Sequence, residues 1–240
     1  MPTVDLTKLY QIMSAHMGPS GWWPSDTKRD IIVGAILVQN TYWRNADKSL
    51  VNLKNATQMD AQKLLALSQD DLIDLIRPSG FYKNKSKAIH NVFQWFEDRN
   101  WNYHQIWLDN RATLRPQLLK LPGVGNETAD DYLVYIFDQP DFIADTYARR
   151  LFAHFGYTKT DSYPHLKQQV DLPRTFTYEM AQDFHGLIDN FGKQYLQHEG
   201  DFETSFLIDE MPNFTLRSRL GKIRLRTSII TILARPHYSA

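Results

Sequence analysis

Residues 121–156 read LPGVGNETADDYLVYIFDQPDFIADTYARRLFAHFG, and this stretch decides the fold. Gly123 and Gly125 stand between two helical patterns, where they permit a tight turn and bring backbone amides to the surface. The helix predicted to start near Asn126 adds unpaired N–H groups at its positive end. A phosphate can therefore bind here through the backbone, which fixes the register of a nucleic acid without reading its sequence.

An aspartate follows this turn, twenty residues past the second glycine. Asp145 directly precedes the apolar helical pattern of residues 147–155, so it is typical of a helix N-cap. A capping carboxylate stays ionised and is held in one place, which also suits a catalytic group. The two interpretations are compatible, and both stay open at this point.

The order of these features resembles the helix-hairpin-helix (HhH-GPD) DNA glycosylases of the endonuclease III superfamily. The match runs from LPGVG through Thr128-Ala129 and an apolar helix to Ile143-Ala144-Asp145-Thr146 and Arg149-Arg150. It implies an all-α fold of two helical lobes with the active site between them, and Asp145 as the catalytic residue. It also implies DNA contacts by the hairpin and a monovalent cation that the carbonyls of Leu121 and Gly123 could hold. The expected hairpin contacts are Leu121, Gly123, Val124, Gly125 and Thr128.

Two further stretches extend the resemblance over most of residues 20–200. Gln39-Asn40-Thr41 is similar to the polar turn that, in this family, wedges into the duplex where a base has been flipped out. Residues 79–96, SGFYKNKSKAIHNVFQWF, resemble a helix start of the pattern Gly-hydrophobic-Tyr-x-x-Lys. The resemblance therefore implies that Gln39 and Asn40 contact DNA, and that the partner is double-stranded DNA with a damaged base.

Two departures from the family pattern narrow the expected chemistry. Bifunctional members carry a lysine two places after the second hairpin glycine and attack the sugar through its amine, whereas this chain has Glu127. A glutamate cannot form a Schiff base, so we expect no strand-cutting lyase activity. Endonuclease III also carries four cysteines for an iron–sulfur cluster. This chain has no cysteine, and we expect no cofactor and no essential metal.

Tryptophans near the N-terminus point to a subgroup. Gly21-Trp22-Trp23-Pro24, Trp43 and the NETAD helix start resemble the cluster-free 3-methyladenine DNA glycosylases of this superfamily, which implies that Trp22, Trp23, Pro24 and Trp43 line a base pocket. An alkylated purine is cationic, so flat rings around it would add cation–π attraction to stacking. Adjacent tryptophans are also typical of a core, or of a hydrophobic staple before a helix that Ser25 or Asp26 would cap.

Two charged residues are candidates for the same pocket. Lys193 matches a pocket lysine of the subgroup, and a water-poor environment would make its amine nucleophilic enough to take up CO₂. The alternative for Lys193 is an exposed position on an amphipathic helix. Glu127 is either a cleft residue or an acidic residue favoured in the first turn of a helix.

These features predict a monofunctional glycosylase of base-excision DNA repair. It would hydrolyse the N-glycosidic bond of alkylated, 3-methyladenine-like purines and leave an abasic site. One alternative is a glycosylase for mispaired adenine, uracil or thymine, which would use the same turn and aspartate with a different pocket. Another is a non-catalytic, structure-specific DNA-binding protein in which Asp145 only caps a helix.

Composition limits the classes of protein to which the chain can belong. The chain has 240 residues and a formal net charge of zero, which counts against a generic DNA binder because phosphate neutralisation supplies most non-specific affinity. No apolar run approaches the roughly 20 residues that a membrane-spanning helix needs. We therefore expect a cytoplasmic protein that does not contact membranes. We also expect it to be a monomer.

Apolar residues recur at intervals of three and four, which predicts about ten helices. The resemblance assigns residues 1–29 and 140–211 to a terminal lobe and residues 30–139 to a central lobe, with the helix-hairpin-helix at 111–138. Residues 212–240 form a basic tail whose structure the sequence does not predict. Its basic residues lie in a stretch free of acids: Arg217, Arg219, Lys222, Arg224 and Arg226.

Overall fold

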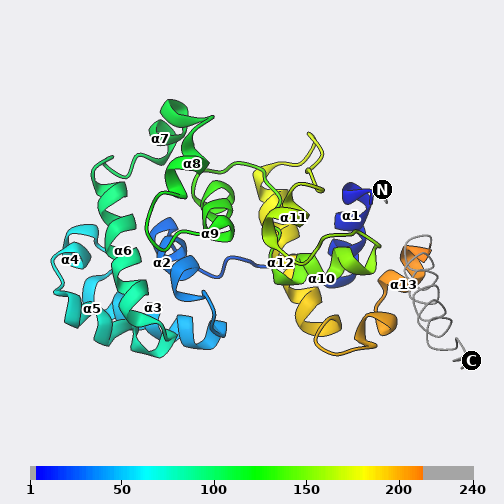
Figure 1. Cartoon of the computed structure of the whole chain (residues 1–240), viewed down its shortest axis with the longest axis horizontal. Helices are drawn as coiled ribbons and strands as arrows, with labels where there is room; N and C mark the ends of the chain where they lie inside the picture. The colour runs from blue at the N-terminus through cyan, green and yellow to red at the C-terminus, as the bar shows by residue number, and fades with distance from the viewer. Residues whose placement is uncertain (1–3, 213–240) are drawn as a thin grey trace, which may run out of the picture. The chain divides into compact units, whose positions relative to one another are not determined.

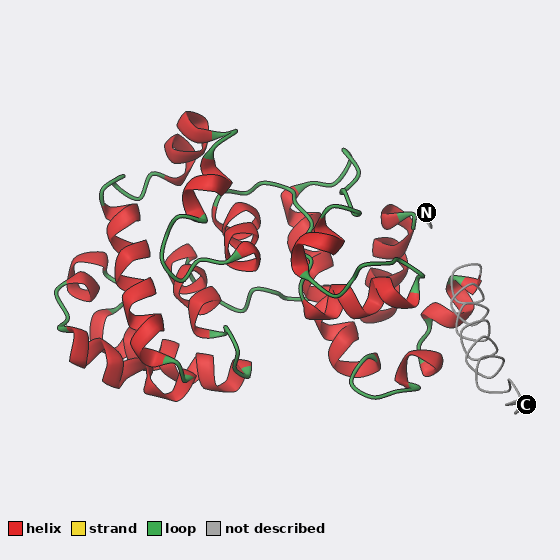
Figure 2. Cartoon of the chain, in the orientation of Figure 1, coloured by secondary structure: helices red, strands yellow, loops and turns green. Residues whose placement is uncertain are grey.

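A computed structural model describes residues 4–212 of the chain. Within this range the chain forms thirteen α-helices, three short turns of 3-10 or π type and no β-strand (Figure 2), so the predicted all-α fold is confirmed. Four of the α-helices, α4, α8, α11 and α13, have only four or five residues. A helix of four or five residues is too short to show a periodic pattern of apolar residues, which is why the sequence predicts fewer helices than the structure contains. The basic cluster of the predicted tail lies outside the described residues.

The chain divides into two compact units. Unit 2 comprises residues 21–143 and 174–182, and unit 1 comprises residues 4–20, 144–173 and 183–212 of the described range. Unit 2 contains α2 (Lys28–Leu37), α3 (Trp43–Thr57), α4 (Ala61–Leu65), α5 (Gln69–Ile76), η1 (Arg77–Ser79), α6 (Tyr82–Glu97), α7 (Tyr103–Asn110), α8 (Leu114–Leu118), α9 (Asn126–Asp131) and the π-helical turn η2 (Tyr132–Ile136) (Figure 1). Unit 1 contains α1 (Leu6–Met17), α10 (Thr146–His154), α11 (Tyr163–Lys167), η3 (Asp201–Thr204) and α13 (Leu207–Glu210). α12 (Tyr178–Tyr195) contributes residues 178–182 to unit 2 and the rest to unit 1.

α2 is the central helix of unit 2, because every residue from 31 to 37 is apolar or glycine. Ile32 and Ile36 are fully buried, and α2 packs against α3, α6 and η2. Burial of a side chain of this size contributes roughly 1.5–3 kcal/mol. The hydroxyl of Tyr132 in η2 donates a hydrogen bond to the carbonyl of Ile32 at 2.9 Å. α2 leads directly into the turn at Gln39 and Asn40, so this packing sets where that turn lies.

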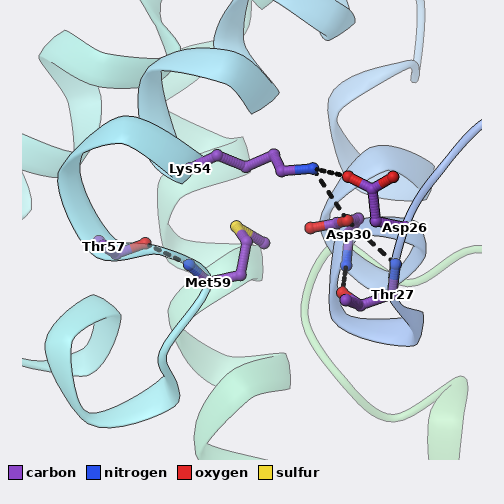
Figure 3. A network of polar contacts seen from close by, with 6 residues as sticks. All are labelled: Asp26, Thr27, Asp30, Lys54, Thr57 and Met59. Carbon is purple, nitrogen blue, oxygen red and sulfur yellow. Dashed lines mark hydrogen bonds and ion pairs between the residues drawn. The ribbon is translucent and has the colours of Figure 1, made fainter.

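A polar network fixes the N-terminus of α2 (Figure 3). Thr27 and Asp30 form a capping box: the N–H of Asp30 donates to Thr27 Oγ1 (3.2 Å) and the N–H of Thr27 donates to Asp30 Oδ2 (3.1 Å). Lys54 of α3 donates to Asp30 at 3.2 Å and to Asp26 at 2.6 Å, which gives the buried Asp30 a counter-charge. The prediction that Ser25 or Asp26 caps this helix is therefore wrong. Thr27 is the cap, and Asp26 binds Lys54 instead.

Unit 1 is built around the C-terminal part of α12. Phe191 is fully buried there and contacts Phe202 of η3. Asp183 accepts hydrogen bonds from the hydroxyl of Tyr10 in α1 (3.2 Å) and from the N–H of Ser20 (2.7 Å). These contacts hold the N-terminal helix against a segment that follows it by more than 160 residues.

Within residues 4–212 no helix is both long and apolar enough to span a membrane. Over the same range, no group of three or more His, Asp or Glu side chains is arranged to hold a metal ion. The whole sequence lacks cysteine, so the chain cannot form a disulfide or hold a cysteine-ligated iron–sulfur cluster.

Candidate functional site

The hairpin of residues 121–125 joins α8 to α9, which pack against each other in unit 2. Gly123 has a φ of +85°, and a Cβ there would lie closer than 3.0 Å to the Cβ of Ala88 in α6, so only glycine fits without movement. Gly125 has a φ of −91° and caps α9, and no other part of the described chain lies within 4 Å of where its Cβ would be. The space beside Gly125 is therefore open to a phosphate. Val124 is buried and anchors the turn.

Arg115 fastens the two helices of this motif together. Its Nε donates to Oδ1 of Asp130 (2.6 Å) and its Nη2 donates to Oδ2 of Asp130 (3.2 Å) and to Oδ1 of Asn126 (3.1 Å). Asp130 is fully buried. A bidentate pair holds its two partners in one geometry, so the angle between α8 and α9 depends on Arg115.

Gln39 contacts the hairpin. Its side-chain NH₂ donates to the carbonyl of Gly123 and to Oγ1 of Thr128, both at 3.0 Å. Thr128 is 3% exposed, so its hydroxyl is buried in this contact. Asn40 is exposed and has a φ of +52°. Of the three polar side chains predicted to contact DNA, two therefore bind each other, and Asn40 presents its amide to solvent.

A hollow of about 130 Å³ lies beside the hairpin, with Asn40, Phe81, Lys85 and Gly123 among its lining residues. Phe81 is 65% exposed and has a φ of +46°. An exposed ring beside an exposed amide is suited to stacking on nucleic-acid bases. Phe81 was not among the residues predicted from the sequence. The available signal was an aromatic residue between Gly80 and a helix start.

Lys85 fixes both exposed turns from inside. Its ammonium donates to the carbonyl of Leu37 at the end of α2 (2.8 Å) and to the carbonyl of Ser79 in η1 (2.7 Å). Leu37 precedes the turn that carries Asn40, and Ser79 precedes Phe81. Lys85 is 3% exposed, and burial lowers the pKa of its amine to about 8. The two carbonyl acceptors act in the opposite direction, because they favour the charged form.

The three tryptophans form one cluster in unit 2. The ring centroids of Trp22, Trp23 and Trp43 lie 5.3, 5.4 and 5.9 Å apart in pairs. Trp23 also packs on Tyr135 and on Gly34, where a Cβ would lie 3.3 Å from the indole nitrogen.

The rings of this cluster touch one another. A purine between two rings needs their centroids about 7 Å apart, twice the ~3.5 Å contact distance. Trp22 and Trp43 are 5.4 Å apart, with an angle of 59° between their planes. All three tryptophans are partly exposed. The predicted base pocket would therefore have to open between Trp22 and Trp43.

The other predicted pocket residues are exposed. Pro24 follows Trp23 in unit 2, and Glu127 lies in the first turn of α9 in the same unit. Lys193 belongs to unit 1, where its side chain is 47% exposed and forms an ion pair with Asp189 one turn earlier on α12. A pocket role for each of the three stays a prediction.

Asp145 is the N-cap of α10 in unit 1, which confirms that it starts a helix. Its Oδ1 accepts a hydrogen bond from the N–H of Ala148 at 2.6 Å, and its Oδ2 lies 4.0 Å from Nε2 of His185 on α12. The residue is only 8% exposed. A helix N-terminus favours the ionised carboxylate. A carboxylate held in this way at a helix N-terminus is suited to stabilise a developing positive charge.

His185 is a residue of this region that the sequence did not reveal. Its side chain is 10% exposed, and burial together with the ammonium of Lys193 lowers the pKa of the imidazole to about 3. The imidazole is therefore neutral at neutral pH. No local pattern connects His185 to Asp145, because they lie far apart in the chain and meet only through the packing of α10 on α12.

A glycine sets this packing. The ring of Tyr147 lies against Gly192 of α12, where a Cβ would come closer than 3.0 Å to the ring. The hydroxyl of Tyr147 accepts a hydrogen bond from the side chain of Gln197 at 2.7 Å. Because Tyr147 is two residues after Asp145, Gly192 determines how closely the carboxylate approaches α12.

Each hairpin carbonyl that could hold a monovalent cation already accepts one hydrogen bond. The carbonyl of Leu121 accepts from the N–H of Val124 at 3.0 Å, and that of Gly123 accepts from Gln39. A carbonyl oxygen has a second lone pair, so each can still contact one further group. The cation stays a prediction.

Comparison with known protein sequences relates the chain to DNA repair. Residues 33–173 match the family model of the HhH-GPD superfamily base excision DNA repair proteins. A protein of Methanocaldococcus jannaschii that is provisionally assigned as a DNA repair glycosylase is 35% identical over 193 residues, which cover 78% of this chain and 87% of that protein. Endonuclease III of Thermotoga maritima is 25% identical over 197 residues, which cover 82% of this chain and 88% of that protein.

Solved structures agree with this relationship. The 3-methyladenine DNA glycosylase MagIII of H. pylori, solved with 1,N6-ethenoadenine bound, superposes with a TM-score of 0.67 at 25% identity and covers 81% of this chain and 100% of its own. A trapped endonuclease III–DNA covalent intermediate superposes with a TM-score of 0.67 at 18% identity and covers 85% of this chain and 92% of its own. At this low identity the likeness shows the fold alone. The family match and these likenesses confirm the predicted superfamily and fold. The chain is a DNA glycosylase that belongs to the HhH-GPD superfamily of base excision DNA repair proteins.

Proposed function

We propose that this DNA glycosylase removes cationic, alkylated purines of the 3-methyladenine type by hydrolysis alone. The observation that carries the proposal is the cluster of Trp22, Trp23 and Trp43. Alkylation at N3 or N7 gives the purine a positive charge, and an aromatic face attracts a cation by about 0.5–2 kcal/mol beyond stacking. A normal purine gains only the stacking. Similarity to MagIII, a 3-methyladenine DNA glycosylase, supports this substrate class.

The contact between Trp22 and Trp43 itself favours a charged base. A pair of aromatic rings in contact is worth about 0.5–1.5 kcal/mol, and a base that enters between them forfeits this energy. Stacking of a neutral base returns about 1–3 kcal/mol, so the net gain is small. A cationic base adds about 0.5–2 kcal/mol of attraction to the rings, which offsets the energy of the lost ring contact. The closed cluster would therefore select against normal purines.

Unit 2 also carries the groups proposed to bind DNA. The backbone amides next to Gly125 would donate to a phosphate in the open space beside that residue. Asn40 and Phe81 are exposed, and they would fill the gap left by the flipped nucleotide, with the ring stacked on the neighbouring bases. Flipping costs a few kcal/mol and least at a damaged pair, so selection begins before the base reaches the tryptophans.

The bond that breaks joins C1′ of the sugar to the purine nitrogen. Its electron pair leaves with the base, whose positive charge it neutralises, so the leaving group needs no added proton. The sugar becomes an oxocarbenium-like cation, which the carboxylate of Asp145 stabilises. A water then forms the bond to C1′ and gives its proton to Asp145, which leaves an abasic site.

Strand cutting is not part of the proposal. The position of the lysine that forms a Schiff base in bifunctional members is Glu127 in this chain, and a carboxylate cannot form that bond. The purified protein should therefore leave abasic sites uncut until alkali is added. Borohydride should trap no covalent protein–DNA adduct, and a trapped adduct would contradict the monofunctional assignment.

Asp145→Asn tests the catalytic assignment. Asparagine caps a helix as well as aspartate does and keeps an oxygen for the N–H of Ala148, so the variant should fold normally. It cannot balance the positive charge on the sugar, so single-turnover excision from methylated duplex should fall by roughly 10²–10³-fold. Affinity for the duplex should stay within about threefold, since the phosphate contact is unchanged.

The same assay separates the alternatives when it includes mismatched and uracil-containing duplexes. Release of base from methylated duplex by the parent protein, and loss of that release in Asp145→Asn, is the expected result. Release only from mismatched or uracil-containing DNA would overturn the substrate class. Tight binding without release from any duplex would favour a non-catalytic DNA-binding protein.

A further inference from the structure

A second polar group lies beside the proposed catalytic carboxylate. Nε2 of His185 is 4.0 Å from Oδ2 of Asp145, which exceeds the ~2.7–3.2 Å of a direct hydrogen bond. One water with hydrogen bonds of about 2.8 Å to both atoms spans up to roughly 4.5 Å at a tetrahedral angle. The separation of the two atoms is therefore compatible with a single water that hydrogen-bonds to both.

One contact fixes the carboxylate of Asp145, and another fixes the spacing of the two helices that carry Asp145 and His185. The N–H of Ala148 binds Oδ1 of Asp145, and this leaves Oδ2 on the side of His185. Tyr147, packed on Gly192, presses the start of α10 onto α12, which carries His185. The backbones that carry the two groups are therefore fixed relative to each other.

We infer that His185 is a positioning residue that, together with Asp145, holds the water that attacks C1′, an inference that rests on the proposed function. Nε2–H of the neutral imidazole donates to the water oxygen, and the water donates one hydrogen to Oδ2 of Asp145. One lone pair of the water then forms the bond to C1′, while the C1′–N bond breaks and its electron pair leaves with the base. The water proton goes to Asp145, and His185 neither gains nor loses a proton.

The charge state of the imidazole suits this role. An imidazolium would offset the negative charge of Asp145 and oppose the positive charge that develops on the sugar. Burial and the ammonium of Lys193 keep the pKa of His185 at about 3, although the carboxylate of Asp145 acts the other way. Asp189, one turn from His185 on α12, pairs with Lys193.

Single-turnover excision from methylated duplex by His185→Leu and His185→Gln tests the inference. Leucine keeps the bulk and removes the donor, so the rate should fall by roughly tenfold to a hundredfold, the scale of a lost orientation effect. Glutamine supplies an N–H and should recover part of the loss. His154→Gln is the matched control, because His154 lies at the other end of α10 and stacks on Phe202 at 4.1 Å. It should keep the parental rate.

A partition experiment distinguishes water positioning from general damage. With methanol in the buffer, the sugar cation is captured by either water or methanol, and the ratio of the two products reports how well the water is held. His185→Leu should raise the methanol share several-fold over that of the parent. Structural damage alone would slow both products equally and leave the ratio unchanged. If His185→Leu does not fold, His185→Met, which also lacks a hydrogen-bond donor, gives the same comparison.

The outcomes separate this inference from the proposed function. A parental rate in His185→Leu overturns the positioning role and leaves the proposed function intact. A slow variant with an unchanged product ratio and no recovery in His185→Gln also overturns it. The proposed function fails in a different way, because then the parent releases no methylated base or Asp145→Asn releases it at the parental rate.

Discussion

Replacement of Gly123 by alanine should lower the stability of the protein. Gly123 has a φ of +85°, where alanine costs about 1–2 kcal/mol, and its Cβ would come closer than 3.0 Å to the Cβ of Ala88. Overpacking of this kind costs about 1–3 kcal/mol. The sum is roughly 2–5 kcal/mol, and at about 2–4 °C per kcal/mol the melting temperature should fall by roughly 4–20 °C.

Gly125 provides the matched control. Its φ of −91° and ψ of −175° suit alanine, and no other part of the described chain lies within 4 Å of the added methyl group. Alanine is a poorer helix cap than glycine, by about 0.5–1 kcal/mol, so Gly125→Ala should melt within about 4 °C of the parent. The methyl group would occupy the space proposed for a phosphate. Affinity for undamaged duplex should therefore fall by roughly tenfold, or about 1.4 kcal/mol.

Thermal unfolding and fluorescence anisotropy with a labelled duplex measure the two effects. The double variant Gly123→Ala/Ala88→Gly removes the methyl group that the new Cβ would meet. The double variant should regain the part of the stability that the steric overlap removes, less about 1 kcal/mol for the new glycine within α6. It should not regain the part that the positive φ costs an alanine at position 123. A Gly123→Ala variant that melts with the parent would refute the turn geometry. Parental DNA affinity in Gly125→Ala would refute the phosphate contact.

Trp43→Phe should keep most of the excision rate on methylated duplex, whereas Trp43→Leu should lose roughly tenfold to a hundredfold, because stacking on a base is worth about 1–3 kcal/mol. Equal excision rates in the two variants would show that the tryptophan cluster is a structural core and not a base pocket. Arg115→Met deprives the buried Asp130 of its bidentate partner, so the free energy of unfolding measured by urea titration should fall by roughly 3 kcal/mol. The double variant Arg115→Met/Asp130→Leu should recover most of this loss, because it leaves no buried carboxylate without its partner. Folded His185 has a pKa of about 3 against 6.5 when unfolded, so the unfolded state binds more protons between these values and the free energy of unfolding should decrease as the pH falls. The decrease should be at most about 5 kcal/mol. If the free energy of unfolding changed with pH in the same way in the parent and in His185→Gln, this prediction would be contradicted.

Features that depend on neighbouring residues could be predicted from the sequence. The hairpin needs only its two glycines, and the cap at Asp145 needs only the apolar helical pattern that follows it. The start of α2 shows the limit of such reasoning, because Ser25, Asp26 and Thr27 are all good caps. The choice among them depends on Lys54, which binds Asp26 and leaves Thr27 to cap the helix.

The contacts that complete the site join residues far apart, and no local pattern marks them. Gln39 meets Gly123 across 84 positions of the chain. His185 meets Asp145 only because Gly192 lets α10 approach α12 closely. The sequence groups the tryptophans by a family resemblance, but it does not reveal that their rings touch. Each of these facts follows from the packing of helices, which decides where a side chain points.

The groups proposed to bind DNA are rigidly connected within unit 2, and this bears on how a base is flipped. Gln39 bonds to the hairpin carbonyl of Gly123, and Lys85 bonds to the backbone just before each exposed turn. Unstacking a base costs a few kcal/mol, and a mobile wedge would add the entropy lost when its side chains become ordered. Here the backbone of both turns is already fixed on folding, so that only the side chains of Asn40 and Phe81 remain to be ordered. A phosphate bound beside Gly125 would therefore bring Phe81 against the base stack in the same step.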